Sequence, residues 1–247
     1  MSMPETVLQR AWNALRRRAR PVRRMIRRLA RRRLHVHIEN RWRLGDEIMA
    51  IPFYQLVRER YPNARITVAV NHPDLLRGNP YVEVRNDLTE FDGDRYICAR
   101  DDARNVPRLR HLCQRAHVPY RDLSPSVIPA GPVADRRMGL RIACSCGAGW
   151  PCKSWPAGYL RKLCDLISAA RPDAEFVELG KGCACAGVGE TLVDRLGVGD
   201  TAGVLAQCRF YIGPDSGLSH LAPAVGTPAL TLYGPVHPDT AFGRRDH

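Results

Sequence analysis

The chain has 247 residues, of which 45% are hydrophobic, and its 38 Lys and Arg against 25 Asp and Glu give a formal net charge of +13. This composition supports a packed core and excludes a disordered or collagen-like chain. The length suits one large domain or two small ones. Residues 1–33 hold 12 arginines and one acid, so the rest of the chain, with 26 basic and 24 acidic groups, is nearly neutral.

The basic N-terminal segment also has an apolar face. Its apolar residues recur at three- and four-residue steps: Leu8, Trp12, Leu15, Ala19, Val22, Ile26 and Leu29. This spacing predicts an amphipathic helix that Pro21 would kink. Such a helix favours an anionic surface, so residues 5–33 are predicted to attach the protein to the inner-membrane surface. An unstructured extension or an overlong gene start is the alternative, and the lack of zinc-finger or RNP-type motifs argues against nucleic acid.

Two features indicate a cytoplasmic protein. The N-terminus lacks the apolar segment of a signal peptide, and nine cysteines are an odd number for a disulfide framework. The longest uncharged stretch, 216–238, contains four prolines and three glycines, which argues against a membrane-spanning helix. The pairs Cys144/Cys146 and Cys183/Cys185 could bind zinc or an iron–sulfur cluster. Cysteine is also a common small residue in protein cores, so these pairs need no metal, and none is predicted.

After the N-terminal segment, the expected elements alternate between strand and helix. The first half contains predicted strands at 34–39, 65–70, 81–85 and 95–99, with helices from 45 to 61 and from 106 to 117. A stretch rich in proline and charge follows at 129–138 and reads as a linker. The second half contains predicted strands at 139–144, 174–179, 209–215 and 229–233, with helices at 156–170, 201–208 and 216–225. This order predicts two α/β halves with parallel sheets.

Three loops at the ends of predicted strands carry polar residues. The first is Gly213-Pro-Asp215-Ser216-Gly217-Leu-Ser-His220, where a helix N-terminus offers N–H groups and positive dipole to a phosphate. Asp215 and Ser216 would then contact a ligand or simply cap the helix. A Ser–His hydrolase is disfavoured because no G-x-S-x-G turn is present.

The second loop, Gly147-Ala148-Gly149-Trp-Pro-Cys-Lys153, places a lysine before a helix that opens with proline. A lysine there can hold a diphosphate, or it is an ordinary exposed cation. The third loop, Arg43-Leu-Gly45-Asp46, places a carboxylate near a helix N-terminus. That carboxylate can accept a proton from a hydroxyl group, or it caps the helix.

These segments together resemble glycosyltransferase family 9, the ADP-heptose:lipopolysaccharide heptosyltransferases. The resemblance in the first half rests on residues 45–52, 61–68 and 78–82, and in the second half on 153–156, 213–222, 226–228 and 233–235. It implies a GT-B fold of two Rossmann-like domains, with an acceptor-side domain at 34–128, a linker at 129–138 and a donor-binding domain at 139–247.

The resemblance also implies roles for individual residues. The activity would be inverting transfer of a heptose or related sugar from an ADP-sugar, without a metal, to a hydroxyl of a lipopolysaccharide-core or other cell-envelope glycan. Asp46, beside Gly45 on the acceptor side, would be the general base, and Lys153 would neutralise the leaving diphosphate. The donor would be held by Gly149, Lys153, Asp215, Ser216, Gly217 and His220.

The chain also departs from the family pattern. Both halves are short, and Ala148-Gly149 stands where the family has a hydroxyl-bearing pair before the lysine. The chain ends soon after Tyr233-Gly-Pro235, so an apolar face of the second domain is expected to be uncovered unless a homo-oligomer covers it. The alternative hypothesis is therefore a catalytically degenerate GT-B protein that binds a nucleotide-sugar or a partner without transfer.

Overall fold

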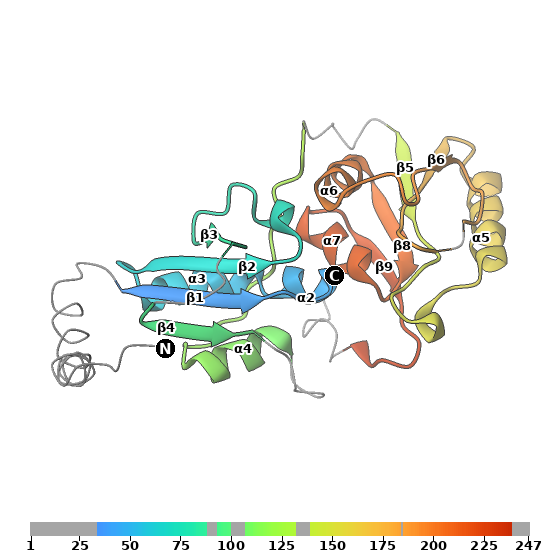
Figure 1. Ribbon diagram of the computed structural model, residues 1–247. Coiled ribbons are helices and arrows are strands. Elements are labelled where there is room, and N and C mark those ends of the chain that lie inside the picture. Colours follow the sequence, from blue (N-terminus) through green and yellow to red (C-terminus); the bar gives the residue numbers. More distant parts are fainter. Residues whose placement is uncertain (1–33, 88–92, 100–106, 132–138, 184, 239–247) are drawn as a thin grey trace, which may run out of the picture.

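The computed structural model describes residues 34–87, 93–99, 107–131, 139–183 and 185–238. It contains two parallel sheets lying side by side, each with its own helices (Figure 1). The prediction of two parallel α/β halves is therefore confirmed. The amphipathic helix expected at 5–33 and residues 132–138 of the expected linker lie outside the described residues.

The first sheet has the strand order β3-β2-β1-β4. Its strands are β1 (His35–Asn40), β2 (Arg65–Val70), β3 (Glu83–Val84) and β4 (Arg95–Cys98). All its pairings are parallel, and Val36 lies opposite both Ile66 and Arg95. Alternate residues such as Val36 and Ile38 are fully buried, and they share one hydrophobic core with residues of α3 (Ile51–Arg60) and α4 (Arg108–Ala116).

The helix expected between residues 45 and 61 is divided in two. A short helix α2 (Leu44–Met49) ends at Ala50, and α3 begins at Ile51 with Pro52 in its first turn. The division has a simple cause, because Pro52 lacks the N–H that a continuous helix would use there. The result is a separate turn that carries Gly45 and Asp46 at the carboxyl end of β1.

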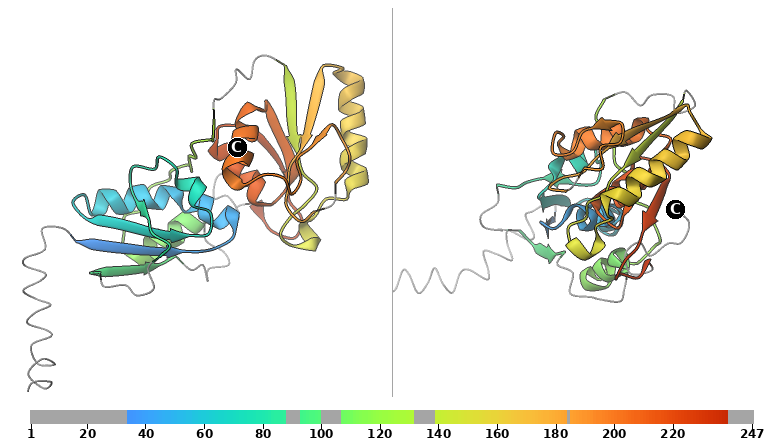
Figure 2. Two further views of the ribbon diagram at one scale, coloured as in Figure 1. Left: turned by 45° about the horizontal axis from the view of Figure 1, so that its top comes forward. Right: turned by 90° about the vertical axis from the view of Figure 1, so that its right-hand side faces the viewer.

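The second sheet has the strand order β7-β6-β5-β8-β9, again with parallel pairings throughout. Its strands are β5 (Leu140–Cys144), β6 (Ala174–Glu178), β7 (Glu190–Thr191), β8 (Phe210–Pro214) and β9 (Ala229–Leu232). Helix α5 (Ala157–Ala170) lies on one face, and α6 (Val198–Gln207) and α7 (Gly217–Ala224) lie on the other (Figure 2). The two-residue β7 was not predicted, and α6 begins three residues before its expected start.

The two domains contact each other through α2 and α7 (Figure 1). A Cβ atom on Gly217 would lie 2.7 Å from Cδ2 of Leu44, so only glycine permits this approach. The chain has already reached the second domain at Val127, whose N–H donates to the carbonyl of Ala224. One hydrophobic core runs through both domains, which fixes their relative position. Within the described ranges, no helix is both long and apolar enough to cross a membrane.

Candidate functional site

An ion pair at the carboxyl edge of the second sheet joins two of the predicted loops. Lys153, at the end of the short 3₁₀ helix η2 (Pro151–Lys153), places its Nζ 2.5 Å from Oδ2 of Asp215. The Lys153 side chain is 17% exposed and that of Asp215 is 5% exposed. A well-shielded pair of this kind is stronger than a surface salt bridge, so each residue holds the other at the end of β8.

Asp215 leads directly into the N-terminus of α7. Ser219 holds this turn, because its hydroxyl accepts the N–H of Ser216 at 3.1 Å and donates to the Ser216 carbonyl at 2.7 Å. The first N–H groups of a helix have no acceptor within the helix, and they lie at the positive end of its dipole. The turn therefore presents a site suited to an anion beside the Lys153 ammonium group.

Trp150 stands between cations of both domains. Its ring is 44% exposed, and the Nζ of Lys153 lies 4.9 Å from the ring centroid. The guanidinium of Arg43, in the first domain, lies 5.1 Å from the same centroid. Cations at these distances are attracted to the face of an indole ring. Trp150 thus adds a second link between the domains beside the lysine.

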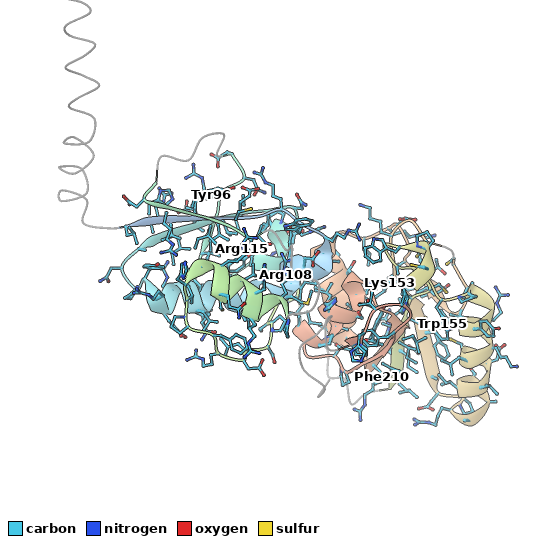
Figure 3. All side chains as sticks on the ribbon, turned by 90° about the horizontal axis from the view of Figure 1, so that it is seen from below. Tyr96, Arg108, Arg115, Lys153, Trp155 and Phe210 are labelled. Carbon is cyan, nitrogen blue, oxygen red and sulfur yellow. The ribbon has the colours of Figure 1, made fainter. Side chains whose placement is uncertain are left out.

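Asp46 lies on the first-domain side, in the first turn of α2, with a side chain that is 28% exposed. Its Oδ1 is 3.7 Å from Nη1 of Arg108, which is almost fully buried. Figure 3 shows Arg108 and Lys153 on the two sides of the domain contact. Each domain therefore brings a carboxylate and a cation to the same region.

The neighbouring carboxylate, Glu47, is buried and holds the backbone together. It is 1% exposed, and it accepts the N–H groups of Trp42, Asn71 and His72 at 3.0, 2.7 and 3.0 Å. The ring Nδ1 of His72 lies 2.8 Å from the same carboxylate. Glu47 therefore ties the turn before α2 to the loop after β2 and fixes the position of Asp46.

His220 lies at the point where the domains meet. It is 7% exposed, and its Nε2 is 3.9 Å from Oδ1 of Asp215. A Cβ atom on Gly45 would lie 2.8 Å from Cδ2 of this imidazole. The ring is therefore packed between the donor-side Asp215 and the residue that precedes Asp46.

Two tyrosines lie near the residues of this region. The Tyr211 side chain is fully buried, and its hydroxyl, near Ser145 and Ser216, has no hydrogen bond of ordinary geometry among the described residues. Burial raises the pKa of Tyr211. Burial, followed by the negative charge of Asp215, raises the pKa of Tyr233. Both phenols therefore stay neutral.

One cysteine of the second half, Cys185, contacts the buried carboxylate of Glu178. Cys185 Sγ donates to Oε2 of Glu178 at 3.0 Å, and the N–H groups of Ala186 and Gly187 donate to the same side chain. Burial raises the pKa of Cys146 to about 11, which keeps this thiol protonated. Within the described ranges, no three His, Cys, Asp or Glu side chains are arranged to hold a metal ion.

A separate hollow of about 680 Å³ lies at the amino ends of β1 and β2. Arg58, which lines it, donates to the carbonyls of Tyr81 and Ala64 and so holds the local backbone. This hollow is at the opposite end of the sheet from the loops described above, where ligands bind in parallel α/β sheets.

The structure brings most of the predicted site residues together. Lys153 and His220 both lie beside Asp215, and Gly45 packs on the imidazole. Gly149 lies on an exposed loop, with nothing within 4 Å of its Cβ position. The catalytic and donor-binding roles of these residues stay predictions.

Four residues of this region were not predicted: Arg43, Glu47, Arg108 and Trp150. One of them left a signal in the sequence. Arg108 shares the spacing of the buried residues Leu112 and Ala116, so it was a charged residue on the core face of α4.

Comparisons with known proteins give the same family as the sequence resemblance. The model of glycosyltransferase family 9 (heptosyltransferase) matches residues 140–242. Lipopolysaccharide heptosyltransferase 1 of Pseudomonas aeruginosa is 36% identical over 107 residues, which are 40% of this chain and 30% of that protein. The chain thus aligns with less than a third of the length of this curated relative.

Solved structures extend the similarity to both domains. One of them is TibC of enterotoxigenic Escherichia coli, described as a dodecameric iron-containing heptosyltransferase and solved in complex with ADP-D-beta-D-heptose. Its superposition on this chain has a TM-score of 0.71 at 15% sequence identity, and it covers 84% of this chain and 61% of TibC. The E. coli ADP-heptose lipopolysaccharide heptosyltransferase II has a TM-score of 0.65 at 17% sequence identity, and the match covers 83% of this chain and 86% of that one. These likenesses show the two-domain GT-B fold, and the match of residues 140–242 shows that the second domain is similar to glycosyltransferase family 9.

Proposed function

We propose that the protein is an inverting glycosyltransferase that moves a heptose, or a related sugar, from an ADP-sugar to a hydroxyl of a lipopolysaccharide-core or other cell-envelope glycan. The observation that supports this proposal is the packing of α2, which carries Asp46, against α7, which follows the Lys153–Asp215 ion pair, with Gly45 packed on His220. The relatives named for heptosyl transfer, and the TibC complex with its ADP-heptose, support the choice of donor.

In the proposed reaction, Asp46 accepts the proton of the acceptor hydroxyl. The acceptor oxygen forms a bond to the anomeric carbon while the bond from that carbon to the phosphate oxygen breaks, and ADP leaves. Lys153 and the N–H groups at the start of α7 offset the negative charge that develops on the diphosphate. Asp215 would keep Lys153 at this position and could also bind a sugar hydroxyl.

The donor site can be tested first by calorimetric titration of the full chain with ADP, UDP and GDP. We expect selective binding of ADP that weakens about tenfold or more in Lys153→Ala, because a charge-assisted contact to phosphate is lost. Lys162→Ala is the matched control, since Lys162 is exposed on α5 away from this region. Failure of a folded protein to bind any of the three nucleotides would contradict the proposal.

Transfer can then be measured as ADP release from ADP-heptose in the presence of lipopolysaccharide from a heptose-deficient strain. We expect Asp46→Asn to abolish release while it leaves the affinity for ADP unchanged. Nucleotide binding without transfer to any cell-envelope glycan would instead support the alternative, a degenerate GT-B protein. The replacement of the family's hydroxyl pair by Ala148-Gly149 is the observation that favours that alternative.

A further inference from the structure

A buried arginine lies directly behind Asp46. Arg108 is 3% exposed, and its Nη2 donates to Oδ1 of Asn40 at 3.1 Å and to the carbonyl of Ala99 at 3.0 Å. Its Nη1 lies 3.7 Å from Oδ1 of Asp46. A buried guanidinium is unfavourable unless a negative charge compensates it, and Asp46 is placed to do so.

The hydrogen bonds behind Arg108 make its position rigid. Asn40, at the end of β1, is fully buried, and its Nδ2 donates to the hydroxyl of Tyr54 at 2.7 Å. Tyr54, on α3, is 1% exposed, and burial raises its pKa, so the phenol stays neutral. Residues of β1 and α3, and the carbonyl that follows β4, thus combine to hold one guanidinium.

Two other titratable side chains of the described residues near Asp46, those of Glu47 and His220, are engaged with other groups. The Glu47 carboxylate is directed at the backbone N–H groups of Asn71 and His72. His220, which faces the same turn from α7, packs on Gly45 and lies 3.9 Å from Asp215. Arg108 therefore places a permanent positive charge of the first domain beside Asp46.

We propose that Arg108 is a positioning residue that keeps the Asp46 carboxylate ionised and aimed at the domain contact. The inference rests on the proposed function, in which Asp46 is the base. Arg108 exchanges no proton itself. When Asp46 takes the acceptor proton, the adjacent guanidinium favours the carboxylate over the neutral acid, which promotes release of that proton to water after the sugar has been transferred.

The charge state of Asp46 can be tested without any activity. Carbodiimides react with protonated carboxyl groups, so the rate at which carbodiimide and glycine ethyl ester label Asp46 at pH 6, read by peptide mass spectrometry, reports its ionisation. We expect labelling about tenfold faster in Arg108→Met than in the native chain, which corresponds to about one pKa unit. Arg108→Lys, which keeps the charge, should label slowly. Equal rates in the native and Met variants would overturn the proposal.

Arg110→Ala is the matched control. Arg110 is on the same helix but exposed, with its guanidinium 5.5 Å from the Tyr120 ring, and its loss should leave the labelling of Asp46 unchanged. If Arg108→Met fails to fold, Arg108→Gln carries the labelling test, because it also removes the charge but keeps an amide that can donate to the Asn40 side chain and the Ala99 carbonyl. We expect faster labelling of Asp46 in this variant, and a rate equal to that of the native chain would refute the pairing.

Turnover separates this inference from the proposed function. We expect Arg108→Met to lower kcat about tenfold or more, with ADP affinity and the KM for donor unchanged, and Arg108→Lys to recover part of the loss. A native chain that shows no transfer would contradict the proposed function, while the labelling rates would still decide the inference. A rise in the KM for donor with kcat unchanged would show that Arg108 serves donor binding instead.

Discussion

Replacement of Gly45 by alanine tests how closely the two domains approach each other at the site. The new Cβ would lie 2.8 Å from Cδ2 of His220 and 3.3 Å from its Nε2. Nonbonded carbon atoms are comfortable at about 3.5 Å or more, so the shortfall is about 0.7 Å. His220 is 7% exposed and packed beside Asp215, and its ring has little room to turn away.

The sign of the effect follows from two opposing terms. Overpacking of a tight contact costs about 1–3 kcal/mol, whereas alanine is preferred over glycine within a helix by at most about 1 kcal/mol. The net expectation is a destabilisation of about 1 kcal/mol. For a chain of this size, that lowers the unfolding midpoint by about 3 °C. If the domains separate instead, Asp46 moves away from the donor side by several tenths of an ångström, which can cost about tenfold in kcat.

Thermal unfolding and donor titration on the same preparations distinguish these outcomes. Gly158→Ala is the matched control, because Gly158 is also the second residue of its helix but has nothing within 4 Å of its Cβ position. We expect Gly158→Ala to unfold at the same or a higher temperature and Gly45→Ala to bind ADP normally. A Gly45→Ala variant as stable as Gly158→Ala, with normal turnover, would refute the close approach of α2 and α7.

Three further changes test the surroundings of the site. Glu47→Gln removes the charge that accepts three backbone N–H groups and should lower the free energy of unfolding by about 3 kcal/mol, measured by urea titration. Burial alone would raise the pKa of Glu178, but hydrogen bonds from Cys185 and the Ala186 N–H outweigh it, so the pKa lies below its usual 4.5. The native chain should therefore exceed Glu178→Gln in stability above about pH 5, and this advantage should disappear as the pH falls through the folded pKa; a pH-independent difference would contradict the shift. Iodoacetamide at pH 8 should label the exposed Cys152 and leave the buried Cys146 unmodified, as read by mass spectrometry.

Local patterns predicted the regular elements well because neighbouring residues decide them. The strand expected at 65–70 is β2 with the same bounds, since its β-branched residues alternate between two buried surfaces. The errors come from tertiary contacts. β7 has two residues, and its pairing with β6 depends on a loop that folds back over Glu178. A pair of residues carries no periodicity that a sequence pattern could reveal.

The sequence predicted the loops that form the site, but it did not predict which of their side chains pair with each other. Lys153 and Asp215 were each recognised, but their ion pair joins positions 62 residues apart in the chain. Arg108 reaches Asp46 across the same separation, from the core face of α4, and its spacing with Leu112 and Ala116 does not say which carboxylate it faces. Parallel topology brings strand ends together, but side-chain directions at those ends depend on the packing of both domains.

The surroundings of the two carboxylates indicate which of them can act as the base. Asp215 is 5% exposed, with an ammonium group at 2.5 Å and an imidazole at 3.9 Å. Proton transfer to it would break a shielded ion pair and leave Lys153 uncompensated. Asp46 is 28% exposed, and its Oδ1 lies 3.7 Å from Nη1 of Arg108. A hydroxyl from solvent can therefore approach Asp46 more easily than Asp215, and this difference in exposure supports the proposed role of Asp46 as the base.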